Sequence, residues 1–138
     1  MIKLILGKSG SGKTRYLIEQ ANDEKSRGNG NIVFIDTDDA HIFTLDYAVR
    51  LINANTYGIN NVDALGGFVA GIISRDYDIE KIYLDGIYEI IDFADENLER
   101  LINRLIEISN KNEVDIYMGL EIEESELPKG LDVEVKVL

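Results

Sequence analysis

The sequence Gly7-Lys8-Ser9-Gly10-Ser11-Gly12-Lys13-Thr14 decides how the rest of this chain is interpreted. It fulfils the spacing G-x-x-x-x-G-K-[ST] in full. A short apolar run, Ile2 to Leu6, precedes it, and a segment with helical spacing of apolar residues, Lys13 to Arg27, follows it. Glycines let backbone N–H groups curve around an anion, and a helix that begins there adds its positive end. The loop is therefore predicted to bind phosphate groups.

The residue types in the loop predict separate roles for two of its members. Lys13 is expected to reach the β- and γ-phosphates of a nucleoside triphosphate, and the Thr14 hydroxyl is expected to bind Mg²⁺. The sequence predicts ATP and Mg²⁺ as ligands, although no base pocket is legible in it. The remaining candidates for contact with the phosphates are Gly7, Lys8, Ser9, Gly10, Ser11, Gly12 and Arg15.

A second hydrophobic strand that ends in an acid would complete the magnesium site. Ile82-Tyr83-Leu84-Asp85 has this form, so Asp85 is predicted to hold the ion with Thr14. Asp36, which follows the apolar run Ile32 to Ile35, is its main competitor.

Strand and helix patterns alternate along the whole chain, which predicts right-handed crossovers and a parallel sheet. We expect one domain, residues 1–138, with a three-layer α/β/α sandwich and a mostly parallel sheet of about five strands. Residues 44–57 fit either a short helix over 44–52 or a small strand over 51–57. The predicted strands cover 2–6, 32–35, 81–85, 114–118 or 114–120, and 133–137, the last at an edge. The first predicted helix, 13–27, ends in the glycine-rich turn Gly28 to Asn31. The second, 62–75, is capped by Asn60 or Asn61, and close packing is expected to compensate for Gly66, Gly67 and Gly71. Asp92 or Asp95 is expected to cap the third.

Composition narrows the classes of function. The net charge is −12, and six of the 14 Lys and Arg residues lie in residues 1–31, around the glycine-rich loop. An acidic body repels a nucleic-acid backbone, so nucleic acid is not the expected partner. The absence of cysteine excludes disulfides and thiolate chemistry. No apolar run is long enough to span a membrane, and a cytoplasmic location is expected.

The segment Val33-Phe34-Ile35-Asp36-Thr37-Asp38 resembles the second core strand of RecA-like ATPases, a branch of the P-loop NTPases. The resemblance extends from Met1 to about Met118. It implies that Asp38 activates the attacking water, with Asp36 as the alternative. The family usually has Glu at this position, so the resemblance implies a weak Mg²⁺-dependent ATPase.

The same residues are also similar to the MinD/ParA group. That group carries an extra lysine after the first loop glycine, where Lys8 stands, and an Ile-Asp-x-Asp strand end, here Ile35 to Asp38. In the group this lysine reaches the nucleotide of a partner subunit, which would imply a homo-oligomer. Ser9 interrupts the Gly-Gly pair that the group has, and a solvated loop lysine is the simpler interpretation of Lys8. The whole chain also resembles stand-alone bacterial ATP-binding proteins of similar length.

Two further functions remain open. A nucleotide-sensing module without significant hydrolysis, acting on an unidentified protein partner, is favoured by Gly86 after Asp85 and by Asp at position 38. A small-molecule kinase would need arginines over the phosphates, and Arg50 and Arg75 are the only ones in the middle of the chain. Glu89 and His41 are weighed as catalytic groups, but a solvated acid and an ordinary loop histidine are the simpler interpretations.

Overall fold

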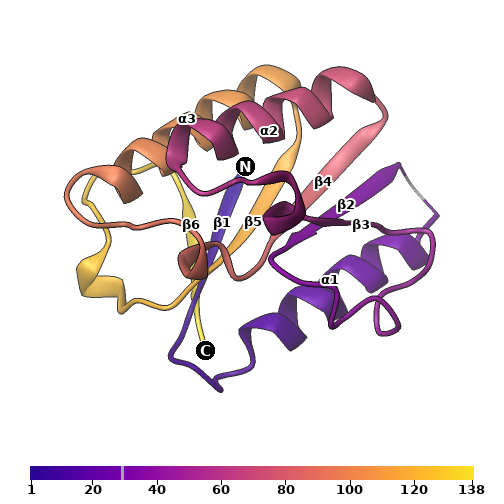
Figure 1. Ribbon diagram of the computed structural model, residues 1–138, viewed down its shortest axis with the longest axis horizontal. Helices are drawn as coiled ribbons and strands as arrows, with labels where there is room; N and C mark the ends of the chain where they lie inside the picture. The colour runs from indigo at the N-terminus through magenta and orange to yellow at the C-terminus, as the bar shows by residue number, and fades with distance from the viewer. Residues whose placement is uncertain (29) are drawn as a thin grey trace.

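The fold is that of a layered α/β protein, seen in a computed structural model that describes residues 1–28 and 30–138. Six parallel strands form one sheet in the order β3-β2-β4-β5-β1-β6 (Figure 1). The predicted α/β class and parallel sheet are confirmed. The strands are β1 (Ile2–Leu6), β2 (Asn31–Asp36), β3 (Arg50–Asn53), β4 (Ile79–Leu84), β5 (Asp115–Leu120) and β6 (Glu134–Val137).

The sheet has one strand more than the predicted number of about five, because residues 50–53 pair with β2 as strand β3. The alternative of a helix over residues 44–52 is therefore excluded. The strand is shorter than the predicted 51–57, because residues Ala54–Tyr57 turn into a 3-10 helix, η1. The edge position predicted for the last strand is confirmed, since β6 pairs only with β1 at the end of the sheet.

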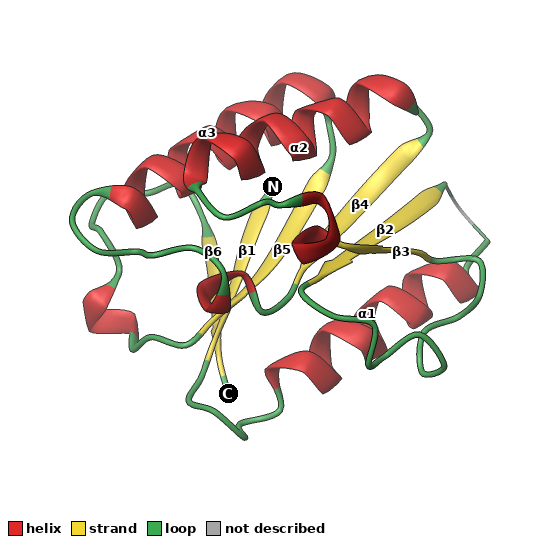
Figure 2. Ribbon diagram, in the orientation of Figure 1, coloured by secondary structure: helices red, strands yellow, loops and turns green. Residues whose placement is uncertain are grey.

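Three α-helices cover the two faces of the sheet (Figure 2). Helices α2 (Val62–Arg75) and α3 (Asn97–Asn112) pack on one face, where they bury most of the apolar core. Helix α1 (Lys13–Ser26) packs on the other face, against Ile5, Phe34 and Tyr83. Two further 3-10 segments, η2 (Ile87–Glu89) and η3 (Glu124–Glu126), follow β4 and β5.

The predicted helix caps are confirmed for α2 and wrong for α3. The side chain of Asn61 accepts a hydrogen bond of 2.8 Å from the first turn of α2. Helix α3 is instead preceded by Glu96, without a side-chain cap. Asp92 is used in the turn before the helix, where it accepts a hydrogen bond from the Ala94 N–H, and Asp95 has φ 57°.

The glycines of α2 have different environments. We expected close packing to explain all three, and this is confirmed at Gly66, where an added Cβ would lie 3.0 Å from Cγ of Arg104 on α3. It is wrong for Gly67 and Gly71, because a Cβ there would meet nothing within 4 Å.

The glycine-rich turn predicted after α1 begins at Gly28, which has φ 74°. Helix α1 ends at Ser26, and β2 starts at Asn31. Asn29, which belongs to the predicted turn, lies outside the described residues.

The strand order positions the predicted loop. Strand β5 lies between β1 and β4. The chain leaves β1 toward the face covered by α1, whereas after β4 it continues to α3 on the opposite face. Loops that diverge in this way leave a crevice at the carboxyl ends of the strands, which is where open α/β sheets bind ligands.

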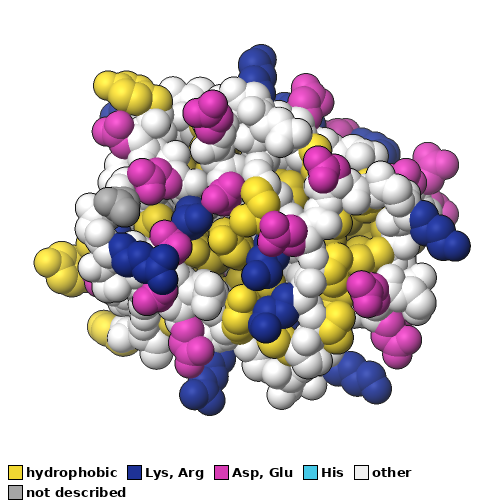
Figure 3. All heavy atoms as spheres, turned by 180° about the vertical axis from the view of Figure 1, so that it is seen from behind, with side chains coloured by type: hydrophobic (Ala, Val, Ile, Leu, Met, Phe, Trp, Pro, Cys, Tyr) yellow, Lys and Arg dark blue, Asp and Glu magenta, His cyan; other side chains and the backbone are white. Residues whose placement is uncertain are grey.

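The surface is mixed in charge on the face shown in Figure 3, where acidic and basic side chains are interspersed around exposed hydrophobic ones. Within the residues that the structure describes, no helix has the length and apolar character to cross a membrane.

Candidate functional site

The segment 7–14 is a curved loop that ends at the start of a helix. Gly10 and Gly12 have φ values of 80° and 95°, a region that side chains with a Cβ rarely adopt. The first helical hydrogen bond of α1 runs from the Tyr16 N–H to the Gly12 carbonyl. The N–H groups of residues 13–15 precede it and have no partner within the helix. The loop therefore offers backbone donors at the positive end of α1.

Gly7 and Ser11 pack directly against each other. A Cβ added to Gly7 would overlap Oγ of Ser11 and lie 2.9 Å from its Cβ. Oγ of Ser11 is buried and has no hydrogen-bond partner within residues 1–28 and 30–138. The first glycine of the motif is thus required because the loop folds back onto it.

Lys13 lies inside the curve of the loop, and its side chain is buried. Its ammonium donates hydrogen bonds to the carbonyls of Gly7, at 2.8 Å, and Lys8, at 2.9 Å. It also lies 5.7 Å from the centroid of the Tyr88 ring, a distance at which a cation is attracted by the ring face. Within the described residues its hydrogen-bond acceptors are both neutral carbonyls, so an anion in the loop would be a stronger acceptor.

Three other loop candidates are arranged differently. The Ser9 N–H donates a hydrogen bond of 3.0 Å to Oε1 of Glu121, the first residue after β5. Lys8 is exposed. The Arg15 side chain is exposed at the rim of the loop and pairs with Glu19 at 3.0 Å. Backbone contacts at residues 10–14 are therefore better placed for an anion than these side chains.

Asp36 ends β2, Asp85 directly follows the neighbouring strand β4, and the two residues lie beside each other. Ile35 is paired with Leu84 in the sheet, and the Asp85 N–H donates to the Ile35 carbonyl at 2.9 Å. Both carboxylates are only 4% exposed. Oδ2 of Asp85 accepts a hydrogen bond of 2.7 Å from the Thr14 hydroxyl. The structure thus brings together the Thr14 and Asp85 side chains that the sequence predicted as a pair.

The environment favours the protonated form of both acids. Burial, with a smaller contribution from the charge of Asp85, raises the pKa of Asp36 to about 6, although the hydrogen bond from the Thr37 N–H opposes this shift. Burial also raises the pKa of Asp85, although the hydrogen bond from Thr14 and the nearby His41 lower it. Oδ2 of Asp36 and Oδ1 of Asp85 have no hydrogen-bond partner among the described residues. A cation or a shared proton would relieve this arrangement.

The oxygen atoms at these strand ends suit Mg²⁺. The ion prefers carboxylate and hydroxyl oxygens, and it usually takes one or two carboxylates and completes its octahedron with water and substrate phosphates. Asp85 and Thr14 supply such atoms, and the orphaned Oδ1 of Asp85 is available. No cluster of three or more His, Asp or Glu side chains suited to a metal occurs in the described part of the chain. The site therefore fits an ion held largely by a bound phosphate, not a closed protein cage.

Asp38 and Glu89 are both exposed acids, and they differ in how close they lie to Lys13. Asp38 is exposed, and its carboxylate accepts a hydrogen bond of 2.8 Å from the Ala40 N–H. Glu89, weighed as a base but more simply interpreted as a solvated acid, lines the same hollow as Lys13 and accepts a long hydrogen bond of 3.4 Å from the Thr37 hydroxyl. Neither Asp36 nor Asp38 lines that hollow.

The loop opens into a hollow of about 730 Å³ that continues along α1. Asn22 of α1 fixes the segment that closes its far side, because it donates to the Thr44 carbonyl at 3.0 Å and accepts from the Asp46 N–H at 2.8 Å. The lining residues are Ser9, Gly10, Gly12, Lys13, Thr14, Arg15, Ile18, Glu19, Asn22, His41, Thr44, Tyr88 and Glu89.

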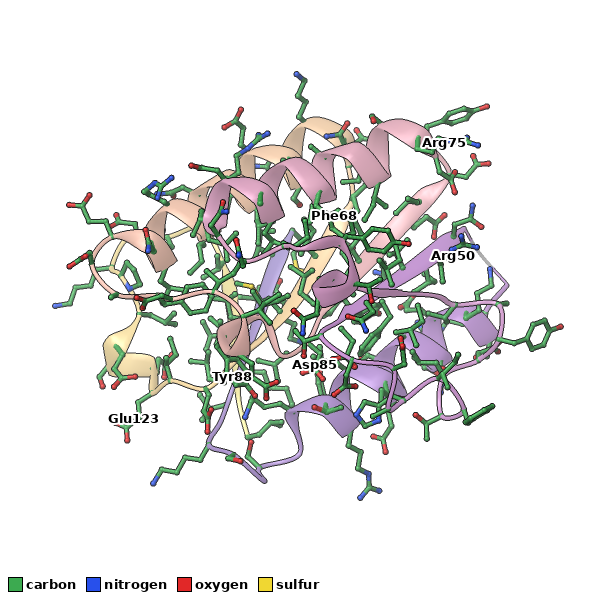
Figure 4. All side chains as sticks on the ribbon, viewed as in Figure 1. Arg50, Phe68, Arg75, Asp85, Tyr88 and Glu123 are labelled. Carbon is green, nitrogen blue, oxygen red and sulfur yellow. The ribbon has the colours of Figure 1, made fainter. Side chains whose placement is uncertain are left out.

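Tyr88 and Glu121 were not found from the sequence. Tyr88 lines the hollow beside Lys13, and Figure 4 shows it and Asp85 on the side of the molecule where the strands end. Burial and the acids around it, Asp85 and Glu121 first, raise the pKa of Tyr88 to about 12. Its position three residues after Asp85 was the only available signal. Glu121 depends on the pairing of β5 with β1, which the sequence does not display.

No protein-family model matches this chain, and a search of curated proteins also found no match. Function is therefore inferred from the residues of the site.

Proposed function

We propose that this protein binds a nucleoside triphosphate, with ATP and Mg²⁺ as the expected ligands, and hydrolyses it slowly. In this proposal the chain is a P-loop NTPase of RecA-like type. The observation that carries it is the loop of residues 7–14, in which left-handed glycines, a helix start and a buried ammonium surround one point. The resemblance of residues 33–38 to RecA-like ATPases also supports it.

Lys13 would bind the terminal phosphates. Its ammonium already lies in the concave side of the loop, and a phosphate oxygen is a stronger acceptor than the two carbonyls that it now contacts. The N–H groups at the start of α1 would complete the cradle, since they have no helical partner. Together these donors stabilise the charge of the phosphoryl group as it transfers.

Thr14 and Asp85 would hold the metal ion. The Thr14 hydroxyl, which now donates to Asp85, and the orphaned Oδ1 of Asp85 would supply the protein's oxygen atoms to the ion. When bound, Mg²⁺ supplies positive charge that polarises the terminal phosphate.

Asp36 is the best-placed acid to orient the attacking water. It is buried beside Asp85, and a pKa of about 6 is suited to a base near neutral pH. Asp38 is turned toward its own loop, so we rank it second. Glu89 is the third candidate, because it lines the hollow.

Calorimetric titration with ATP, GTP and ADP, each with and without Mg²⁺, tests binding directly. We expect Lys13→Ala to weaken affinity for Mg-ATP about 100-fold, near 2.7 kcal/mol. Lys129→Ala, which removes an equal charge from an exposed turn, is the matched control and should leave affinity unchanged. Equal affinities for wild type and a folded Lys13→Ala protein would contradict the proposal.

A nucleotide-sensing module without hydrolysis is the second candidate function. It is favoured by Gly86, which follows Asp85 with φ 70°, where an added Cβ would lie 2.9 Å from Oγ1 of Thr37. No acidic side chain can be accommodated at this position without a shift of Thr37. Phosphate release by wild type and by Asp36→Asn, Asp38→Asn and Glu89→Gln separates the two functions. Equal rates in all four proteins would leave binding intact and remove the ATPase mechanism.

A further inference from the structure

Strand β3 forms an open edge of the sheet with a groove along it. Two hollows of about 350 and 690 Å³ share Arg50, Ile52 and Ile72, so they form one continuous depression beside the strand. The aromatic ring of Phe68 lines it and packs against the exposed ring of Tyr57, with 5.9 Å between centroids. We call this depression the β3 groove. Peptide groups on the open side of an edge strand have no partner in the sheet and can pair with another strand.

The β3 groove also carries the two arginines that lack an acidic partner. Arg50 and Arg75 form no ion pair within residues 1–28 and 30–138, and both line the groove. Figure 4 shows them at the same end of the molecule, with Phe68 farther along. The other four arginines contact acids, in the pairs Arg15–Glu19, Arg27–Asp23, Arg100–Asp63 and Arg104–Glu107.

The charges along the groove are arranged in a self-complementary way. Arg50 is the first residue of β3, and Asp39 lines the groove together with Asn53, the last residue of the strand. A positive group therefore marks one end of the edge and a negative group the other. Asp76 and Asp78 line the part of the groove near Arg75, but a hydrogen bond from Asn31 already occupies one oxygen of Asp76.

We propose that two copies of this chain pair antiparallel through their β3 strands, about a two-fold axis. In this arrangement Arg50 of each copy faces Asp39 of the other, and the same patch serves both copies, as closed dimers require. Tyr57, Phe68 and Ile72 supply the apolar surface that four residues of strand pairing do not provide alone. The inference does not depend on nucleotide binding, since the β3 groove shares no lining residue with the hollow of the phosphate loop.

Sedimentation equilibrium over a range of protein concentrations, at low salt and without nucleotide, tests the proposal. Wild type is expected to change from the monomer mass of 15.5 kDa to twice that mass. Arg50→Glu and Asp39→Arg should each weaken the dimer about tenfold, because each places like charges opposite one another twice. The double variant Arg50→Glu/Asp39→Arg should restore the affinity to within about threefold of wild type, since it exchanges the two charges.

Arg104→Glu is the matched control, because it makes the same charge change on the exposed surface of α3 and should leave the dimer intact. Circular dichroism confirms that each variant is folded. A protein that stays monomeric at all concentrations overturns the proposal, and the groove would then be free for an extended segment of another protein. A dimer that Arg50→Glu does not weaken, or that the double variant does not restore, also overturns it.

Discussion

The two ends of the central strands differ in how many buried oxygen atoms they leave without a hydrogen-bond partner. At the amino ends, Ser109 is 1% exposed, and its hydroxyl donates to the Val114 carbonyl at 2.6 Å and accepts from the Met1 ammonium at 2.7 Å. At the carboxyl ends, Asp36, Asp85 and Ser11 each bury an oxygen that has no partner among the described residues.

This difference separates stability from function within one sheet. Buried polar groups in folded proteins are nearly always hydrogen-bonded, because each one left unpaired costs free energy. At the amino end Ser109 follows that rule, and the Tyr83 hydroxyl, whose charged neighbours Glu24 and Asp115 lie toward that end, is an exception. At the carboxyl end three oxygens break the rule, where the loop of residues 7–14 and two raised pKa values coincide, which is the pattern of a ligand site. The variants below test the contrast, in order of decreasing expected effect.

Asp36→Asn should stabilise the fold at neutral pH and have little effect in acid. Asp36 has a pKa of about 6 in the folded protein and 3.8 when exposed. The folded state therefore holds a proton between these values that the unfolded state has lost, and stability declines as pH rises through this range. Above pH 6 the buried charge costs on the order of 3 kcal/mol, at about 1.4 kcal/mol per pKa unit.

Urea unfolding at about pH 4 and pH 7 measures this effect. The gain in unfolding free energy from Asp36→Asn should be near zero at the lower pH and largest at the higher pH. Asp38→Asn, a change of the same chemistry at an exposed site, should show no such trend. A gain for Asp36→Asn that is equal at both pH values would exclude buried charge as its cause.

Gly7→Ala should damage the loop without damaging the fold. The added Cβ would overlap the Ser11 side chain, so the backbone must shift, and displacements of about 1 Å in such sites change function about 100-fold. We expect triphosphate affinity to fall by about that factor in calorimetry. The double variant Gly7→Ala/Ser11→Gly removes the clash and should recover most of the affinity. No recovery would show that Ser11 is not the obstacle.

Ser109→Ala, in contrast to Gly7→Ala, should lower stability and leave the loop of residues 7–14 intact. It leaves the Val114 carbonyl and the Met1 ammonium without this partner, which should lower the free energy of unfolding by about 2 kcal/mol. Nucleotide affinity should not change. Ser74→Ala, which removes an exposed hydroxyl from α2, is the control and should alter stability little. A loss of nucleotide affinity in a folded Ser109→Ala protein would contradict the separation of the two ends.

Gly67→Ala should give the smallest effect, a gain of about 0.5–1 kcal/mol in unfolding free energy. The position is exposed in the middle of α2, and its Cβ would meet nothing within 4 Å. Gly66→Ala is the matched comparison. Its added Cβ would displace Arg104, so this variant should gain less unfolding free energy than Gly67→Ala. Thermal unfolding of both variants measures the difference, and an equal gain would show that the contact with Arg104 is without consequence.

The sequence predicted those parts of the fold that depend on local pattern. Strand β1, the loop after it and the Asn61 cap were predicted because a continuous apolar run, a spaced motif and a capping residue act within a few residues. The secondary structure of residues 44–57 could not be predicted, because their apolar residues fit the spacing of a helix and also that of a strand. Only the pairing with β2 makes residues 50–53 a strand.

The candidate site was predictable where its residues are contiguous in sequence. The pairing of Thr14 with Asp85 followed from two local patterns. The burial of Asp36 and the exposure of Asp38 did not, because two acids near a strand end look alike until the neighbouring strand is placed. Tyr88 and Glu121 reach the loop of residues 7–14 through long-range strand order, which no local spacing encodes.

The hydrogen bond between Thr14 and Asp85 connects the start of α1 to the carboxyl end of β4. Thr14 belongs to the first turn of α1, Asp85 directly follows β4, and strand β5 lies between β4 and the strand that leads into the loop. A ligand that binds the Thr14 hydroxyl must either contact Asp85 as well or leave the start of α1 without its hydrogen bond to the end of β4. Amide hydrogen exchange in the first turn of α1 would then register occupancy of the loop without any catalytic readout.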